Sequence, residues 1–317
     1  MGKEEIGEKR KSWKLVLLFV NYCIFSVATT FVNKYVLSVI GFTFPTIFLS
    51  WQTAVGVCLF KLLARMGYID LGNIDRKAVI QWLPAMILFV CMAYSGSRSL
   101  SMTILPVWII VYNVVYVLIA CGDWVIHKKV PTFATQVCAI IVVFSAVMVG
   151  HTDSQFDDMG YAWMEFHCFC AGLYTLYAQA KQDEIKLNEF AKLFLNFVFT
   201  VAVLLPSSFI TGQIYEVIKF PAIYFGRFYF GCFLSGIFGT MLSVTSIWVL
   251  NETNTTTVGI ISTINKVPMT LLSVVLFKMT HNTENIVCIA FGLASGFAFF
   301  VTKYQDVSRV APMVSVT

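Results

Sequence analysis

One cation, Lys266, stands in the middle of a long apolar stretch of this 317-residue sequence. At about 1.5 Å per helical residue, roughly 16 Å separate it from either end of the apolar run 256–277. A lone Lys at the centre of a bilayer costs at least about 2.5 kcal/mol, and its side chain does not easily reach the headgroups over that length. Lys266 is therefore expected to face a watery cavity or an anion, the alternative being an ion pair with an internal carboxylate such as Glu165. Pro268 could break the helix just behind it.

Other polar and aromatic residues could join Lys266 around a ligand. Arg98, among small residues at the junction of the runs 78–97 and 103–122, is either a cation at a cavity mouth or an interfacial residue solvated by headgroups. Each of the remaining candidates more commonly holds helices together. Collectively they offer amides, hydroxyls and rings for a phosphate-bearing nucleotide: Asn265, Ser262, Thr263, Asn196, Ser243, Asn113, Tyr22, Trp108 and Tyr112.

No enzyme motif competes with this interpretation. The sequence contains no HExxH, GxSxG, Walker A or GxGxxG pattern, and its four His residues are scattered along the chain. The nine Cys residues lie in or beside apolar runs and are interpreted as small apolar side chains rather than a disulfide framework or metal site. We expect neither an enzyme nor a cofactor.

Membrane-spanning helices must position these residues. The chain is 58% hydrophobic and 12% charged, with a mean hydropathy of +0.78, whereas soluble domains carry about 25% charged residues. The net charge of +5 is spread along loop edges with no basic stripe, which excludes a nucleic-acid partner. A helical span needs about 20 apolar residues, and the sequence offers ten apolar runs: 13–33, 44–66, 78–97, 103–122, 133–150, 159–180, 191–212, 224–250, 256–277 and 284–302.

The basic residues predict how these spans are oriented. Most Lys and Arg residues flank the spans on the side that holds the N-terminus, which the positive-inside rule assigns to the cytosol. An even number of spans then places both tails, 1–12 and 303–317, in the cytosol. Short loops leave membrane lipid as the main environment.

An internal repeat is suggested by two of the runs. Run 103–122 can be overlaid on run 256–277 so that Asn113 meets Asn265. Two halves, 13–150 and 159–302, would each hold five spans and would insert in opposite orientations, with a binding site between them near the midplane. The predicted fold class is an all-α integral membrane protein with ten transmembrane helices in two inverted five-helix repeats.

Three segments resemble a known family. Residues 262–268, Ser-Thr-Ile-Asn-Lys-Val-Pro, resemble the Gly-Ala-Leu-Asn-Lys motif of GDP-mannose transporters, and residues 33–38 and 97–100 resemble the end of their first helix and their third-to-fourth helix junction. These are nucleotide-sugar transporters of the drug/metabolite transporter superfamily. The resemblance implies the ten-helix inverted fold and exchange of a cytosolic nucleotide sugar for a lumenal nucleoside monophosphate across the Golgi or endoplasmic reticulum membrane. It also implies that Asn265 and Lys266 hold the ligand, with Lys266 against phosphate.

One departure bears on which base is carried. The Phe-Tyr-Asn-Asn motif linked to guanine recognition reads Phe194-Leu195-Asn196-Phe197 here, so one amide is replaced by a ring. A site that loses a hydrogen-bonding amide loses discrimination between bases. UDP-N-acetylglucosamine is thus slightly preferred over GDP-mannose. The tail 303–317 ends without a dilysine or KDEL-type signal, which favours the Golgi.

Several alternatives stay open. A carrier of small phosphorylated metabolites would need a denser cationic site, whereas run 284–302 has no interior cation. A carrier of neutral or cationic molecules would not need Lys266, and a non-transporting receptor or scaffold would have little loop surface for partners. Gly292 and Gly296 form a GxxxG pattern that serves either a homodimer seam or packing within one chain.

Overall fold

The computed structural model describes residues 3–128, 130–253, 255–277 and 283–314, and every regular element in these ranges is helical. The loops between helices are short. The elements are α1 (Lys3–Lys34), the π-helix η1 (Tyr35–Val39), α2 (Pro45–Arg65), α3 (Arg76–Met102), α4 (Leu105–Val111), α5 (Val114–His127), α6 (Phe133–His151), α7 (Asp158–Ala180), α8 (Glu189–Ile210), α9 (Gln213–Val217), the 3₁₀-helix η2 (Pro221–Tyr224), α10 (Gly226–Glu252), α11 (Thr255–Phe277) and α12 (Thr283–Val314).

Nine segments of the described chain are long and apolar enough to cross a membrane. They coincide with nine of the ten predicted runs, which confirms a multi-pass helical membrane protein. The remaining run, 159–180, forms α7, a 23-residue helix that is not among the nine. Polar residues such as Glu165 and His167 lower its hydropathy, yet it packs along α3 and α5 inside the bundle.

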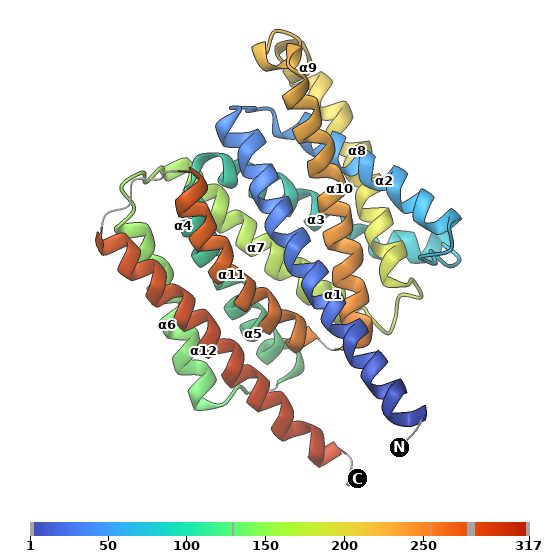
Figure 1. Cartoon of the computed structure of the whole chain (residues 1–317), viewed down its shortest axis with the longest axis vertical. Helices are drawn as coiled ribbons and strands as arrows, with labels where there is room; N and C mark the ends of the chain where they lie inside the picture. Colours follow the sequence, from blue (N-terminus) through green and yellow to red (C-terminus); the bar gives the residue numbers. More distant parts are fainter. Residues whose placement is uncertain (1–2, 129, 254, 278–282, 315–317) are drawn as a thin grey trace.

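The helices lie roughly side by side in one bundle (Figure 1). Helix α1 packs on α10, α2 on α8, α3 on α7, α4 on α11, and α6 on α12. The start of α1 and the end of α12 lie at the same end of the bundle, and α9 lies at the other (Figure 1).

Several helices begin or end at residues that differ from the predicted ones. Both tails are mostly helical, because α1 starts at Lys3 and α12 continues to Val314. Helix α3 extends to Met102, so Arg98 lies inside a helix instead of at a junction between two runs. Pro268 does not break α11, which continues through it to Phe277.

Run 103–122 contains a break that its apolar sequence did not predict. Helix α4 ends at Val111 and α5 begins at Val114, and Asn113 lies between them. Backbone hydrogen bonds here span three residues instead of four. The backbone N–H of Asn113 donates to the carbonyl of Ile110, and the backbone N–H of Tyr116 donates to the carbonyl of Asn113. Tyr112 and Asn113 keep right-handed helical backbone angles, so this break is a local 3₁₀-like tightening within one span. A stretch of this kind inside a helix often marks a functional hinge.

Lys34, at the end of α1, terminates α3. Its buried Nζ donates to the carbonyl oxygens of Leu100 at 2.8 Å and Thr103 at 2.6 Å. The last carbonyls of a helix have no partner within that helix, and a cation there also interacts favourably with the helix dipole. Lys34 thus acts as a cap supplied by another helix.

The GxxxG pattern of α12 is used within the chain. A Cβ at Gly292 would lie 2.4 Å from Ile110 Cγ2, and one at Gly296 would lie 2.8 Å from Asn113 Nδ2. The two glycines therefore let α12 approach the α4–α5 break closely. The structure uses this seam for internal packing, as the second of the two interpretations expected.

Candidate functional site

The side chain of Lys266 is enclosed by neutral groups. Its Nζ donates a 2.5 Å hydrogen bond to Oδ1 of Asn113, and it lies 5.3 Å and 4.8 Å from the ring centroids of Tyr112 and Tyr116. The residue is 7% exposed. None of the ion pairs found in the described ranges includes Lys266. Within those ranges the carboxylate alternative, including Glu165, therefore has no support, and the amine retains donors for an anion.

Two further predicted residues extend this cluster toward α1. Ser262 lies one helical turn before Lys266 on α11, and its side chain lies against those of Tyr22 and Tyr116. Tyr22 is buried in the centre of α1. The cluster formed by Lys266, Asn113, Ser262 and the tyrosines Tyr22, Tyr112 and Tyr116 thus joins three elements that are distant in sequence, and we call it the lysine cluster.

Asn265 and Thr263 are buried beside the cluster and bond to backbone groups. The Nδ2 of Asn265 donates at 3.5 Å to the carbonyl oxygen of Cys23 on α1. The hydroxyl of Thr263 donates at 2.9 Å to the carbonyl of Gly259 within α11. Asn265 therefore ties α11 to α1, whereas the Thr263 bond stays within α11.

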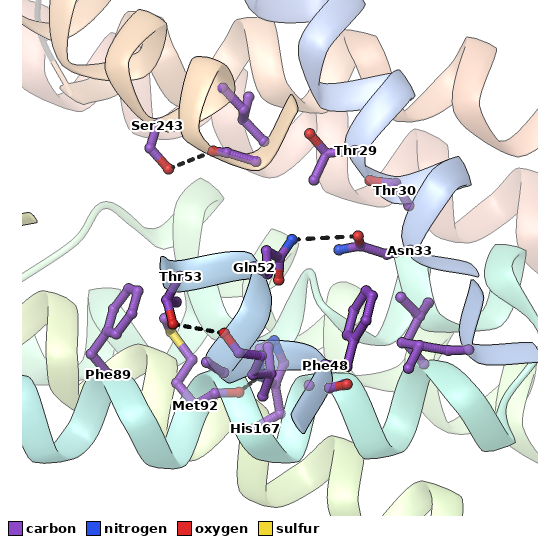
Figure 2. Close-up of a pocket in the computed structure, with 18 of the residues that line it drawn as sticks. Thr29, Thr30, Asn33, Phe48, Gln52, Thr53, Phe89, Met92, His167 and Ser243 are labelled. Carbon is purple, nitrogen blue, oxygen red and sulfur yellow. Dashed lines mark hydrogen bonds between the residues drawn. The ribbon is translucent and has the colours of Figure 1, made fainter. Parts of the chain in front are cut away.

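A cavity of about 370 Å³ lies next to the lysine cluster, between α1, α2, α3, α8 and α10. That volume is within the range of small-molecule sites. Of the predicted site residues, Trp108 and Ser243 line it, and Ser243 is labelled in Figure 2. The described residues that line it include no Asp, Glu, Lys or Arg, and the polar ones are Thr29, Thr30, Asn33, Gln52, Thr53, Ser97, His167, Thr240 and Ser243.

An aromatic pair separates the cavity from Lys266. Trp108 lines the cavity and stacks on Tyr112 with centroids 5.4 Å apart and planes 10° apart. The other side of the pair belongs to the lysine cluster, because Tyr112 is one of the rings beside the Lys266 amine. The Trp108 Nε1 donates to Ser99 Oγ at 3.0 Å, which fixes the ring on α3. The stacked rings thus connect the cavity wall to the surroundings of the Lys266 amine.

Three polar atoms in the cavity wall have no hydrogen-bond partner in the described structure. They are Oγ1 of Thr29, Oγ of Ser97 and Nε2 of His167, and all three atoms are buried. Other polar wall groups are already bonded within the chain, since Gln52 donates to Asn33 and Ser243 donates to a carbonyl of its own helix (Figure 2). Buried polar atoms are normally paired. These three atoms are therefore hydrogen-bonding groups that the described residues of the cavity wall leave unused.

Asn196 is not part of the cavity wall. Its Oδ1 accepts from Trp82 Nε1 at 3.0 Å, and its Nδ2 donates to Tyr174 Oη at 2.9 Å, so it joins α3, α7 and α8. The next residue, Phe197, does line the cavity. Phe197 occupies the position of the second Asn of the Phe-Tyr-Asn-Asn motif. At this cavity-lining position the chain therefore has an aromatic ring instead of an amide.

Arg98 also lies away from the cavity. It is a half-buried residue of α3 whose Nε has no hydrogen-bond partner in the described structure. The structure brings together Lys266, Asn113, Ser262, Tyr22, Tyr112 and Trp108, with Asn265 and Thr263 behind them, and leaves Arg98 and Asn196 apart.

Two kinds of candidate site residue were not predicted from the sequence. His167 and Gln52 are polar residues inside apolar runs, and the rule that identified Lys266 applies to His167 as well. Thr29 and Ser97 gave no comparable signal, because Ser and Thr are common in the packing of membrane helices. Tyr116 could be recognised only from the structure, where it follows the break at Asn113 and its ring lies beside the Lys266 amine.

Comparison with known proteins gives close relatives. No family model matches the chain. The chain is 34% identical over 232 residues to a Mus musculus protein, the UDP-N-acetylglucosamine transporter TMEM241, covering 73% of this chain and 77% of the relative. It is 31% identical over 287 residues to the Xenopus laevis homologue of that protein, covering 90% and 96%. It is 29% identical over 294 residues to the Arabidopsis thaliana GDP-mannose transporter GONST1, covering 90% and 88%.

A solved crystal structure supports the fold. It superposes with a TM-score of 0.55 at 12% identity, over 90% of this chain and 96% of the other. The helices define a multi-pass helical membrane protein with an internal cavity and a buried lysine. The chain belongs to the nucleotide-sugar transporter family, which comprises transporters rather than enzymes. The family resemblance of its motifs is thereby confirmed.

Proposed function

We propose that this protein exchanges cytosolic UDP-N-acetylglucosamine for lumenal UMP across the Golgi membrane, with GDP-mannose and GMP as the second choice. The observation that carries the proposal is Lys266, a buried cation whose described partners are one amide and two aromatic rings. A nucleotide sugar and a nucleoside monophosphate both carry a phosphate that such a cation would bind. Because both carry close to two negative charges, exchange would be nearly electroneutral.

Two observations favour the uridine nucleotide. The vertebrate relatives that resemble the chain carry the name UDP-N-acetylglucosamine transporter, although plant and yeast relatives are named GDP-mannose transporters. In addition, the motif position that faces the cavity holds Phe197, which offers no hydrogen bond to a base.

The helix pairing supports two related halves, 13–150 and 159–302. We assign α1, α2, α3, α4–α5 and α6 to the first half and α7, α8, α10, α11 and α12 to the second. In chain order, α1 corresponds to α7, α2 to α8, α3 to α10, α4–α5 to α11 and α6 to α12. If each helix is exchanged for its counterpart, the α1–α10 contact becomes the α7–α3 contact, and the contacts α2–α8, α4–α11 and α6–α12 stay the same. A two-fold relation between the halves has this property. With α7 as the tenth span, the halves would be inverted, and both tails would be cytosolic.

Transport would then divide the ligand between two places. The uncharged cavity would take the uncharged part of the nucleotide, and Lys266 would take phosphate after the Trp108–Tyr112 pair separates. An empty carrier would have to rearrange with an unpaired buried charge, which is costly. Strict exchange is the expected consequence.

Purified protein in liposomes tests the proposal. Vesicles preloaded with UMP, GMP or no nucleotide would be given labelled UDP-N-acetylglucosamine or GDP-mannose outside. We expect UDP-N-acetylglucosamine uptake that depends on internal UMP, and loss of uptake in Lys266→Met. The matched control is Lys61→Met, because Lys61 is exposed on α2.

Other outcomes separate the rivals. Uptake of GDP-mannose driven by internal GMP would show that the substrate carries guanine instead of uracil, and it would leave the exchange mechanism unchanged. Exchange of small phosphorylated metabolites alone, uptake that persists without internal nucleotide, or full activity of Lys266→Met would each contradict the proposal. Absence of any exchange by folded protein would favour a receptor or scaffold.

A further inference from the structure

We propose that His167 is a specificity-determining residue of this carrier, whose Nε2 accepts a hydrogen bond from an N–H group of the nucleotide base. The inference rests on the proposed function and adds to it a contact on α7. The motif positions lie instead on the helices that carry Asn196 and Lys266.

The hydrogen bond of His167 to the backbone fixes which nitrogen can accept. Its Nδ1 lies 2.8 Å from the carbonyl oxygen of Met92, which can only accept, so Nδ1 carries the proton of the neutral ring. Nε2 is left with a lone pair. That atom is buried without a partner in the described structure, and the whole residue is 7% exposed. An unmade hydrogen bond of this kind is costly unless something else supplies it.

The ring is held in place around this acceptor. A Cβ at Gly96 would lie 2.7 Å from ring atoms of His167, so the glycine admits the imidazole directly against α3. The ring centroids of Trp108 and Tyr112, a stacked pair, lie 5.6 Å and 5.5 Å from that of His167. His167 lines the cavity in this position (Figure 2). Pre-organisation of this kind is what a recognition residue requires.

The surroundings favour a base over a phosphate or a sugar. The described lining has no charged side chain to hold phosphate, and it contains Trp108 and Phe197, which suit a flat ring. Ser97, whose unpaired hydroxyl can donate, lines the same cavity as His167. A donor and an acceptor on one cavity would complement the N–H and the carbonyl of one base edge, as at N3 of uracil or N1 of guanine.

Methylated nucleotides test the contact directly. The affinity of purified full-length protein is measured by titration calorimetry for UMP against N3-methyl-UMP and for GMP against N1-methyl-GMP. Wild type should bind the parent of the preferred pair roughly ten-fold more tightly, because methylation removes the N–H. His167→Asn keeps an amide that can donate to Met92 but places nothing at Nε2, and its preference should fall to near one. His167→Gln places an amide oxygen near Nε2 and should recover part of the preference.

The control is His151→Asn, because His151 is exposed at the end of α6. Its preference should match that of wild type. Equal wild-type binding of parent and methylated nucleotide, or an unchanged ratio in His167→Asn, would show that His167 does not read the base while leaving the carrier intact. Failure of wild type to bind either UMP or GMP would instead remove the proposed function, and this inference with it.

Discussion

Lys266 combines full burial with neutral neighbours in the described structure. Taking an amine out of water costs several kcal/mol, and one amide with two aromatic rings returns only part of that. A residue kept under these conditions serves a ligand better than it serves stability. This distinguishes it from Lys34, whose buried amine bonds to two carbonyls and caps a helix.

Lys266→Met should separate function from stability. Methionine is close in size and removes the desolvation cost, so the free energy of unfolding should be unchanged or raised by up to about 3 kcal/mol. Exchange should be lost. The melting temperature in detergent measures the effect on stability, and nucleotide exchange in liposomes measures the effect on transport. A melting temperature well below that of Lys61→Met would mean that the amine is structural.

Asn196→Ala should behave in the opposite way. It leaves the buried Trp82 Nε1 and Tyr174 Oη without a shared partner, so stability should fall by about 1–3 kcal/mol. Nucleotide affinity of the folded fraction should be unchanged, because Asn196 lies outside the cavity wall. The double variant with Trp82→Phe should lose less free energy of unfolding than the sum of the losses in the two single variants. Additive costs would argue against the hydrogen bond between them.

At the residue scale, a side chain that is rare for its surroundings can be predicted from sequence to lie in a special environment. A Lys in a bilayer span is costly enough that only a special environment retains it, which identified Lys266 without a structure. Ser97 and Thr29 carry no such penalty, so only the cavity reveals them. Asn196 shows the limit of a motif, because a matching amide can be turned toward a neighbouring helix.

At the scale of elements, Lys34 links the end of α1 to the end of α3. Lys34→Met would remove two charge-assisted hydrogen bonds to carbonyls that have few other acceptable partners. We expect a loss of about 2–3 kcal/mol and faster amide hydrogen exchange in residues 100–103. Lys14→Met, an exposed position on the same helix, is the matched control and should change neither. Equal exchange rates in the two variants would remove the capping role.

The close approach of α12 to the α4–α5 break gives a second prediction at this scale. Gly292→Ala places a methyl 2.4 Å from Ile110 Cγ2 and should cost about 1–3 kcal/mol through overpacking. Gly226→Ala, at the start of α10, meets nothing within 4 Å and should be neutral. The melting temperatures of the two variants provide the comparison. If Gly292→Ala instead changed only the oligomeric state, the seam would belong to a dimer.

Helix positions were predictable within a few residues because hydropathy alone determines which segments suit a bilayer. The break at Asn113 was not predictable, since the residues on both sides are equally apolar and the turn is stabilised by contacts from α11 and α12. The pairing of helices also depends on side chains that meet only in three dimensions.

At the scale of the whole molecule, the common end shared by the first and last helices implies an even number of membrane passes (Figure 1). The nine apolar spans of the described chain would put the termini on opposite sides, so we predict that α7 crosses as well. In sealed vesicles, epitope tags at both termini should be digested together by external protease. A cleavage site inserted after Gly212, next to α9 at the other end, should be protected until detergent is added. Opposite protection of the two tags would mean that α7 does not cross.

The wall between the cavity and the lysine cluster also has a pharmacological consequence. A compound shaped like a nucleoside, with no phosphate, could fill the uncharged hollow behind Trp108 yet give the amine of Lys266 nothing to bind. Such a compound would be held without being carried. This geometry therefore points to neutral, membrane-permeant nucleoside mimics as starting scaffolds for inhibitors.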